Sequence, residues 1–500
     1  MGPKTIYDSS KSIYLGSISL SDIFSIIERY FEKTEIQIPQ ILVDKFVIRK
    51  LLKSRKTVDK VNKPVYGVNT GFGKLCNIVI PQQQIEDLQF NLIYSHAAGY
   101  GKPYSPLITF LTILIRLNQL CQGYSGVSVE MIEKLIDYIK VELPTIPYYT
   151  SVGASGDLIP LSHIFIKFMN YYKPKSKESI AFINGTSFSL SNFIVAIFLL
   201  KKLIELSNLT LVLSCLANDV NFSHYSTKLK KTKKNIYFQK VIQDINSQIQ
   251  RIVFSNEDIK THGVMGIQAP YCYRCYPQVV ESLYLMLDVS TDLANNELSS
   301  NTDNPLVIGN DFISSGNFHG NNLSVFSDHL KLHVFQLANL SFHRMNYLLS
   351  PNFLILNEGL NSGFMISQYL CSHLLSELKN SCYPLSMENF PVSLNQEDFV
   401  SYSENNTRKL IISSYFCSMI LTTELMMALQ KIKLLNKKID YKSINVDISK
   451  LFDNQIWEAI NSLPILEDRD FKKFGSIHSF QNIFIRSSKI VRFIEDGCFV

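Results

Sequence analysis

The chain has 500 residues, of which 46% are hydrophobic and 18% are charged. At about 150 residues per domain, this length predicts two or three domains. The charged share lies below the roughly 25% usual for soluble chains, so the chain can bury a large core and a subunit interface, and disorder is excluded. The 49 basic and 43 acidic residues give a net charge of +6, which is nearly neutral for this length and gives no support for a nucleic-acid partner.

Cysteine usage and the N-terminal residues indicate a cytoplasmic protein. The nine cysteines are an odd number without regular spacing, which is typical of reduced thiols. The first residues, MGPKTIYDSSKS, lack the apolar stretch of a signal peptide. The charge-free stretch Ile180–Leu200 is interrupted by Asn, Ser and Thr residues, whereas a membrane span is more uniformly apolar. We therefore expect a soluble protein without a membrane partner.

Residues that break regular structure are few, with 21 Gly and 17 Pro in the chain, and this scarcity predicts long helices. In chain order, the patterns predict a strand at Gln37–Leu42, helices at Phe110–Leu120 and Phe193–Leu213, a solvated loop at Lys228–Lys234, and helices from Asn322 and over Arg408–Lys433. The helix from Asn322 has one apolar face, with residues three or four apart from Phe326 to Leu348. The last helix is apolar almost all round, which is typical of a helix buried in a bundle. The predicted fold class is therefore mainly α.

Eight of the 21 glycines gather in four short segments. These segments are Tyr66–Lys74, Ser151–Pro160, Asn184–Ser187 and Ser314–Gly320. In a helical protein such clusters mark loops with tight or left-handed turns, and loops on a rigid scaffold often carry the chemistry.

The tripeptide Ala154-Ser155-Gly156, preceded by Gly153, permits an unusual reaction of the backbone. Because Gly156 has no side chain, its amide nitrogen can approach the carbonyl carbon of Ala154 in a forced turn. Ring closure with loss of water, followed by loss of the Ser155 hydroxyl, leaves a methylidene group conjugated to a five-membered ring. Such a group is an electrophile, which none of the ordinary side chains supplies. A bare Ala-Ser-Gly is usually only a turn, so the surrounding sequence decides its meaning.

That surrounding sequence, TSVGASGDLIPLSH (150–163), resembles the signature of the aromatic amino acid ammonia-lyase family, whose members carry a methylidene-imidazolone prosthetic group. The resemblance extends over more than 300 residues in the order of the family. The further blocks are YGVNTGFG (66–73), NLIYSHAAGYG (91–101), RLNQLCQGYSGV (116–127), INGTS (183–187), QAPYCYRCYPQV (268–279), TDNPL (302–306), SSGNFHG (314–320), NSGFM (361–365) and NQEDFVS (395–401).

The resemblance implies an architecture and an assembly. It implies the fumarase/aspartase-like fold of the ammonia-lyases, with an N-terminal portion (residues 1–200) that carries the Ala-Ser-Gly loop and the Tyr66 loop. A long helical bundle and C-terminal helices follow in residues 201–500. Members of the family are homotetramers whose sites collect residues from three chains, and the low charge content here agrees with burial between subunits.

The resemblance also implies the catalytic groups. Elimination of ammonia needs an electrophile that improves the amine as a leaving group, which is the role of the ring from Ala154, Ser155 and Gly156. Tyr66 matches the base that removes the β-proton, and its phenol needs a pKa lowered by positive potential, which helix N-termini would provide. Tyr271 matches a further catalytic residue of the family.

Four other positions match substrate-binding residues of the family. Arg274 matches the arginine that binds the substrate carboxylate, which suits its planar fork. Gln268 matches a neighbouring site residue, Asn184 the asparagine beside the prosthetic group, and Phe318 the aromatic wall behind the substrate. No metal and no dissociable cofactor is expected.

Three residues predict the substrate. Ser95-His96 is the pair typical of the histidine-active members, whereas phenylalanine-active relatives usually show Phe-Leu and tyrosine-active bacterial ones His-Leu. Glu397 also matches the histidine-active members. Since an apolar pocket would leave both imidazole nitrogens unpaired, a histidine and a carboxylate suit such a substrate. The expected reaction is the elimination of ammonia from L-histidine to give trans-urocanate, the first step of histidine breakdown.

Several departures from the family pattern keep alternatives open. Ala269 stands where Asp is usual, and Phe399 stands where the histidine-active members have His. Both changes alter the polarity of the pocket without removing a catalytic group. A lyase that acts on tyrosine or phenylalanine, a 2,3-aminomutase, and a catalytically inactive paralogue that serves as a scaffold remain as alternatives.

Two other patterns are weaker. Cys272 and Cys275 form a C-x-x-C pair, but there is no second pair at a distance that suits zinc. Ser155, Asp157 and His163 resemble a hydrolase triad, but no G-x-S-x-G turn surrounds them. Neither pattern is favoured.

Overall fold

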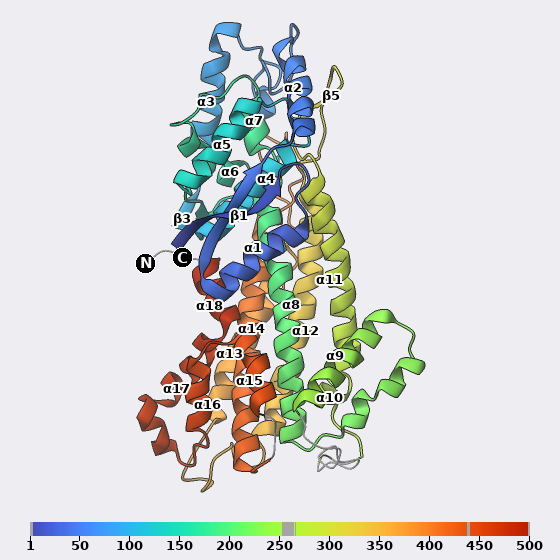
Figure 1. Ribbon diagram of the computed structural model, residues 1–500, viewed down its shortest axis with the longest axis vertical. Coiled ribbons are helices and arrows are strands. Elements are labelled where there is room, and N and C mark those ends of the chain that lie inside the picture. The colour runs from blue at the N-terminus through green and yellow to red at the C-terminus, as the bar shows by residue number, and fades with distance from the viewer. Residues whose placement is uncertain (1–3, 253–264, 266, 438–440, 499–500) are drawn as a thin grey trace.

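Long helices run side by side along the length of the molecule (Figure 1). The computed structural model describes residues 4–252, 265, 267–437 and 441–498. The central bundle consists of α8 (Ser187–Ala217), α11 (Tyr276–Ser299), α12 (Asn321–Leu349) and α14 (Ser403–Leu434), which pack against one another. The predicted mainly α fold class is confirmed.

A cap of shorter elements covers the upper end of the bundle in Figure 1. It contains β1 (Lys4–Tyr14), α1 (Leu20–Lys33), β2 (Glu35–Leu42), α2 (Lys45–Asp59), α3 (Ile85–His96), β3 (Tyr100–Pro103), α4 (Pro106–Leu120), α5 (Val129–Val141), β4 (Pro147–Tyr149), α6 (Leu158–Phe168) and α7 (Glu178–Ile183). Strand β1 pairs with β2 in parallel, and β3 pairs with β4 in antiparallel orientation.

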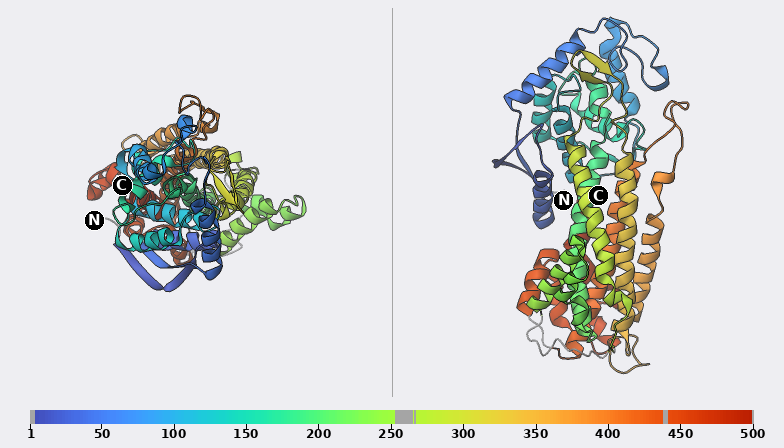
Figure 2. Two further views of the ribbon diagram at one scale, coloured as in Figure 1. Left: turned by 90° about the horizontal axis from the view of Figure 1, so that it is seen from above. Right: turned by 90° about the vertical axis from the view of Figure 1, so that its right-hand side faces the viewer.

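The remaining elements flank the lower bundle or connect its helices. They are α9 (Ile236–Ile252), α10 (Tyr271–Arg274), the antiparallel pair β5 (Leu306–Ile308) and β6 (Asp311–Ile313), α13 (Met365–Ser381), α15 (Tyr441–Leu451), α16 (Gln455–Ser462), α17 (Ile477–Ser487) and α18 (Lys489–Gly497). Figure 2 shows the bundle from the side, with these shorter helices around its lower half.

The predicted helices are present, and their burial follows their patterns. Helices α8 and α14 are buried on nearly all sides, as expected from sequences that are apolar all round. The segments Glu178–Ala217 and Ser403–Leu434 have the length and hydropathy of a membrane span, but most of their residues are buried inside the bundle. The predicted strand is found as β2. The lysine-rich loop prediction is corrected in part, because Thr227–Lys231 forms a short 3-10 helix whose N-terminus is capped by the Ser226 hydroxyl.

One helix joins the cap to the bundle. The predicted boundary at residue 200 lies inside α8, which begins beside the glycine-rich loops and ends deep in the bundle. The first turn of α8 therefore has a rigid connection to the core, and residues of the loops around it are held by the same scaffold.

Candidate active site

The Ala-Ser-Gly loop forms a tight turn between Ser151 and Asp157. Gly153, Ser155 and Gly156 adopt left-handed backbone angles, with φ of 75°, 51° and 77°. A Cβ atom on Gly156 would lie 2.5 Å from the carbonyl oxygen of Gly185, so only glycine fits there. The Asp157 amide donates to that same Gly185 oxygen at 2.7 Å. The predicted forced turn therefore packs directly against the Asn184-Gly185 backbone.

The buried Asp157 ties this turn to the start of α8. Its carboxylate accepts hydrogen bonds from the Ser189 amide at 2.8 Å, the Ser189 hydroxyl at 2.7 Å and the Ser151 hydroxyl at 3.2 Å. Burial raises the pKa of Asp157 to about 6, against the lowering effect of these three bonds.

Three helix N-termini converge on the turn. Helix α6 begins directly after it, α8 begins beside Asp157, and α14 begins at Ser403, whose hydroxyl lies 2.9 Å from that of Ser189. The Tyr402 amide also donates to the Val152 carbonyl at 2.9 Å. Because helix N-termini carry partial positive charge, the backbone supplies positive potential at this turn.

A cavity of about 550 Å³ opens in front of the turn. Its wall combines residues from the Tyr66 loop, α3, the turn, α7 and the segment before α14. Six predicted site residues line it, namely Tyr66, Ser95, His96, Ser155, Asn184 and Glu397. Apolar side chains that the sequence did not single out complete it, among them Phe72, Leu75, Ile78, Leu88 and Ile180.

Tyr66 reaches the cavity from the glycine-rich loop. Its hydroxyl accepts a hydrogen bond from the Gly73 amide at 3.5 Å, and its ring packs edge-on against Phe72. Burial raises the pKa of Tyr66, the Gly73 amide lowers it, and the Glu397 carboxylate raises it further. The residues of one chain therefore do not produce the predicted lowering, because desolvation and negative charge disfavour a phenolate.

His96, at the end of α3, lines the cavity. Its Nδ1 lies 2.8 Å from the Leu92 carbonyl oxygen, so Nδ1 carries the proton and donates to it. Nε2 is then left as an acceptor. Burial lowers the pKa of His96, which favours this neutral form.

Glu397 lies across the cavity on a tight hairpin closed by Val392. The Val392 amide donates to the Glu397 carbonyl at 3.0 Å, and Ser393, Leu394 and Asn395 adopt left-handed angles within the hairpin. The Glu397 carboxylate accepts a hydrogen bond from the Ser155 hydroxyl at 3.1 Å. The hairpin thereby holds the Glu397 carboxylate at the Ser155 turn.

Asn184 contributes an acceptor that lacks a donor. Its Oδ1 is buried and has no hydrogen-bond partner among the residues that the structure describes. Since such an unpaired polar atom costs about 1–3 kcal/mol, a donor at this point of the cavity is favoured. The tight turn and this unpaired acceptor both agree with a prosthetic group at Ser155.

Comparison with known families decides the class of protein. The family model described as aromatic amino acid lyase matches residues 33–170 and 167–451. The chain belongs to this family. It is a carbon–nitrogen lyase of the ammonia-lyase type.

Named relatives of this lyase include histidine ammonia-lyases. The chain is 31% identical to histidine ammonia-lyase of Geobacillus sp. (strain WCH70) over 470 residues, which cover 87% of this chain and 90% of that protein. It is 31% identical to histidine ammonia-lyase 2 of Fusobacterium nucleatum over 473 residues, with 83% and 91% covered. The crystal structure of histidine ammonia-lyase from Trypanosoma cruzi superimposes with a TM-score of 0.79 at 27% identity, covering 97% of this chain and 94% of that one.

The lyase does not bring all the predicted site residues together within one chain. Gln268, Tyr271 and Arg274 lie at or before α10, at the lower end of the bundle, whereas α3 and α7 lie at the upper end (Figure 1). Tyr271 is 69% exposed, and the Arg274 guanidinium lies over its ring at 4.9 Å. Phe318 is half-buried in the loop before α12 and is not part of the cavity wall. These four residues do not line the Ser155 cavity of their own chain.

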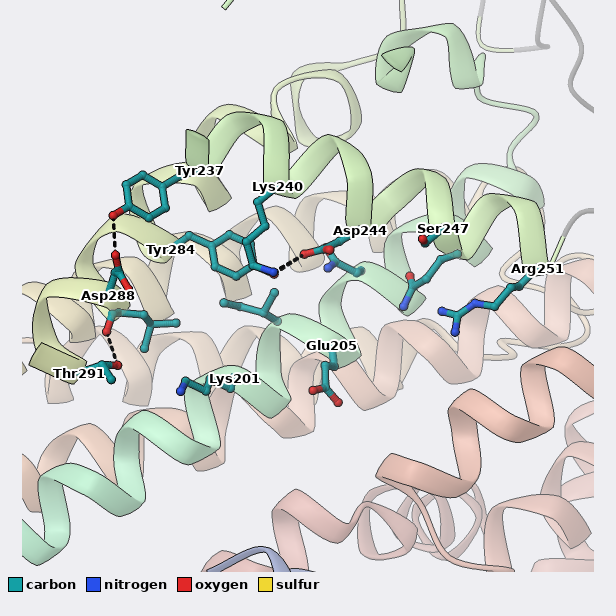
Figure 3. A pocket seen from close by; sticks show the side chains of 14 residues that line it. Lys201, Glu205, Tyr237, Lys240, Asp244, Ser247, Arg251, Tyr284, Asp288 and Thr291 are labelled. Carbon is teal, nitrogen blue, oxygen red and sulfur yellow. Dashed lines mark hydrogen bonds and ion pairs between the residues drawn. The ribbon is translucent and has the colours of Figure 1, made fainter. Parts of the chain in front are cut away.

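A second cavity of about 560 Å³ lies between α8, α9 and α11 of the lyase (Figure 3). None of the predicted site residues lines it. Some of its polar groups pair with one another, as in the hydrogen bond from the Tyr237 hydroxyl to Asp288 at 2.7 Å and the Lys240–Asp244 ion pair at 3.5 Å. Its chemistry is thus separate from that of the Ser155 cavity.

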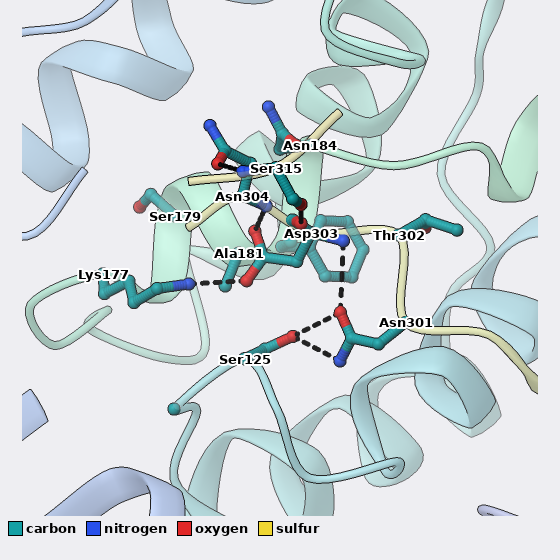
Figure 4. Close-up of polar contacts among 12 residues, drawn as sticks. Ser125, Lys177, Ser179, Ala181, Asn184, Asn301, Thr302, Asp303, Asn304 and Ser315 are labelled. Atoms are coloured by element: carbon teal, nitrogen blue, oxygen red, sulfur yellow. Dashed lines mark hydrogen bonds and ion pairs between the residues drawn. The ribbon is translucent and has the colours of Figure 1, made fainter. Parts of the chain in front are cut away.

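Behind the Ser155 cavity lies a polar layer that sequence reasoning missed as part of the site. Figure 4 shows the buried ion pair of Lys177 with Asp303 at 2.5 Å and the neighbouring residue Thr302. Arg116 is fully buried in the same layer and donates to the Asn184 carbonyl at 2.7 Å. Arg116, Thr302 and Asp303 stand in blocks that resemble the family and Lys177 lies outside them, but nothing local in the sequence indicates that these residues support the loop.

Proposed function

We propose that this lyase eliminates ammonia from L-histidine and releases trans-urocanate. The observation that carries the proposal is that His96 and Glu397 line the same cavity as Ser155. An imidazole offers one N–H donor and one nitrogen acceptor, and an apolar wall would leave both unpaired. Nε2 of His96 and the Glu397 carboxylate are both acceptors, so a protonated substrate imidazole, which has two N–H donors, finds a hydrogen-bond partner for each nitrogen.

The prosthetic group of the proposal is a methylidene-imidazolone formed from Ala154, Ser155 and Gly156. When formed, it supplies the electrophile that turns the substrate amine into a better leaving group. Its formation removes the Ser155 hydroxyl, which is the donor that Glu397 binds in the unmodified chain. The carboxylate is then free to accept an N–H from the substrate.

The other residues bind the substrate and move one proton. The Tyr66 phenolate removes the β-proton and becomes the neutral phenol, and the Gly73 amide, which donates to this oxygen, stabilises the phenolate before the step. Asn184 Oδ1 accepts a hydrogen bond beside the reacting amine. Arg274 binds the substrate carboxylate, with Tyr271, Gln268 and Phe318 around it, and these four residues come from neighbouring subunits.

The proposed assembly is therefore a homotetramer with shared sites, located in the cytoplasm. Positive charge from Arg274 of another chain would lower the pKa of Tyr66, which burial and Glu397 raise within one chain. The place of α10 at the other end of the bundle from α3 and α7 supports such sharing, because Arg274 belongs to α10 and is not part of the wall of its own chain's cavity (Figure 1).

One assay tests this proposal. Purified protein is mixed with histidine, tyrosine or phenylalanine, and the ultraviolet band of a conjugated acrylate is followed. We expect absorbance with histidine. A band with tyrosine or phenylalanine alone would mean that this amino acid, and not histidine, is the substrate. A rearranged β-amino acid as product would indicate an aminomutase. No reaction with any of the three amino acids would favour an inactive paralogue.

A mass measurement tests the prosthetic group separately from turnover. Intact native protein should be lighter than the mass of its sequence by two water molecules. Ser155→Ala protein should not lose the water that derives from the serine hydroxyl, and it should be inactive. Full turnover by Ser155→Ala would contradict the proposal.

A further inference from the structure

Arg116, in α4, is a fully buried arginine whose five N–H groups all have partners. Its Nε donates to the Phe182 carbonyl at 2.9 Å, and one terminal nitrogen donates to the carbonyls of Ala181 and Asn184. The other terminal nitrogen donates to Gln119 Oε1 at 3.1 Å and to Thr302 Oγ1 at 3.0 Å. All five acceptors are neutral oxygens, so the guanidinium charge is held without a carboxylate in contact.

These acceptors show that Arg116 binds the backbone at the C-terminal end of α7. Three of them are the last carbonyls of α7 and the carbonyl of Asn184, which a helix end leaves without intrahelical partners. A cation at a helix C-terminus is also electrostatically favoured. Burial lowers the pKa of Arg116 to about 10, so the side chain is still charged at neutral pH. Arg116 therefore fixes the course of the backbone from Ala181 to Gly185.

That backbone is the surface against which the Ser155 turn packs. A Cβ atom on Gly185 would lie 2.1 Å from a terminal nitrogen of Arg116, and one on Gly156 would lie 2.5 Å from the Gly185 oxygen. The three groups are thus stacked in contact, with Arg116 behind Gly185 and Gly185 behind Gly156. The Asp157 amide, which donates to Gly185, fixes the turn from its other side.

We propose that Arg116 is a positioning residue for formation of the prosthetic group, acting through Gly185 to hold the Gly156 amide nitrogen against the Ala154 carbonyl carbon. This inference rests on the proposed function. In the reaction, a bond forms between Gly156 N and Ala154 C. The Ala154 oxygen leaves as water with the hydrogens of the Gly156 and Ser155 nitrogens, and the Ser155 hydroxyl leaves with the Cα hydrogen as a second water. No oxidant and no external reactant is needed.

The geometric requirement predicts a large effect of a small change. An intramolecular attack loses about a hundredfold in rate when the reacting atoms are misplaced by roughly 1 Å. Arg116→Lys keeps the charge but has three donors in place of the five-donor fork, so it cannot bind all of the α7 carbonyls. We expect the folded Arg116→Lys protein to carry mainly the undehydrated loop, with cyclisation slower by about a hundredfold.

The test compares intact masses with a matched control. Arg344 is equally buried and binds Glu424 through two of its nitrogens in the lower bundle, far along the chain from the turn. Arg344→Lys should lower the melting temperature yet leave the loss of two waters complete. If Arg116→Lys folds and is dehydrated as fully as Arg344→Lys, Arg116 is only structural and the inference is wrong.

A second variant covers the case in which Arg116→Lys does not fold. Thr302→Val is nearly isosteric and removes one acceptor of Arg116, and dehydration is followed by mass after cell-free synthesis. We expect slower dehydration than in the unsubstituted protein, and an equal rate would overturn the inference. If the unsubstituted protein itself is never dehydrated, the proposed function fails rather than the role of Arg116.

Discussion

The Ser155 hydroxyl donates a hydrogen bond to the Glu397 carboxylate at 3.1 Å, although the two residues are 242 positions apart. The turn after β4 and the hairpin before α14 therefore meet at one point of the cavity. Because dehydration of the loop removes the hydroxyl, the same carboxylate has one partner before the prosthetic group forms and another afterwards.

Substitution of Glu397 should weaken histidine turnover without blocking the loop modification. Glu397→Gln removes a charged acceptor, and a hydrogen bond to a charged group contributes about 1.5–3 kcal/mol, or roughly ten- to a hundredfold in kcat/KM. Asp398→Asn, at an exposed neighbouring position, is the control and should change little. Steady-state kinetics checks the loss, and intact mass should show two waters lost in both variants. Unchanged kcat/KM in Glu397→Gln would remove this residue from the substrate site.

His96 should determine the choice between histidine and an aromatic substrate. His96→Leu leaves one imidazole nitrogen of the substrate facing an apolar side chain, at a cost of about 1–3 kcal/mol. We expect kcat/KM for histidine to fall about tenfold or more and the ratio for phenylalanine over histidine to rise. His343→Leu, on the exposed side of α12, serves as the control. A ratio that does not change would mean that the selectivity lies elsewhere.

The stability of the folded protein should depend on pH through His96. Burial lowers the pKa of His96 in the folded chain below its ordinary value of about 6.5, so the unfolded chain binds more protons as the pH falls. The stability contributed by neutral His96 is therefore present above about pH 6.5 and is lost as the pH falls through the folded pKa. Melting temperatures of the unsubstituted protein and His96→Gln, measured from pH 8 to about 5, should converge or cross at the acidic end. A constant difference would contradict the lowered pKa.

Shared sites predict complementation between two impaired proteins. Arg274→Gln chains lack the carboxylate-binding residue and Glu397→Gln chains lack the acid at Ser155. When both are expressed together, a mixed tetramer contains some sites with Glu397 from one chain and Arg274 from another. We expect such mixtures to be more active than either variant alone. Absence of recovery in verified mixed tetramers would mean that each site uses residues of one chain.

The Arg344–Glu424 pair should be a strong determinant of stability. Both side chains are fully buried, and Glu424 also accepts from the Ser214 hydroxyl at 2.6 Å. Glu424→Gln leaves the Arg344 charge without a carboxylate, which costs about 3–5 kcal/mol when one partner of a buried pair is removed. The melting temperature at fixed protein concentration should fall clearly. Glu130→Gln, which breaks the exposed pair with Lys175, should leave it nearly unchanged.

Much of the fold could be predicted because it depends on local patterns. The apolar face from Phe326 to Leu348 became the buried side of α12, and the stretch Arg408–Lys433 became the buried α14, since periodicity and burial are linked along a helix. The turn at Ser155 could also be predicted from its glycines, because the left-handed backbone angles at Gly153 and Gly156 strongly favour glycine.

The site itself was predictable only in part. Tyr66, His96, Asn184 and Glu397 were placed by resemblance, and the structure brings them to one cavity with Ser155. The lowered pKa expected for Tyr66 did not appear within one chain, because burial raises the pKa and the carboxylate of Glu397, far away in the sequence, raises it further. Arg116 was missed for a related reason, since its partners stand on three separate segments.

By itself, the sequence determined the helical class, the reactive tripeptide and the residue types that suit an imidazole, because each of these is expressed in neighbouring or regularly spaced residues. Only the tertiary structure decided which residues lie behind the turn and which are left for another subunit. The physical reason is that contacts such as Ser155 with Glu397, or Arg116 with the end of α7, depend on how rigid helices pack and not on any local preference.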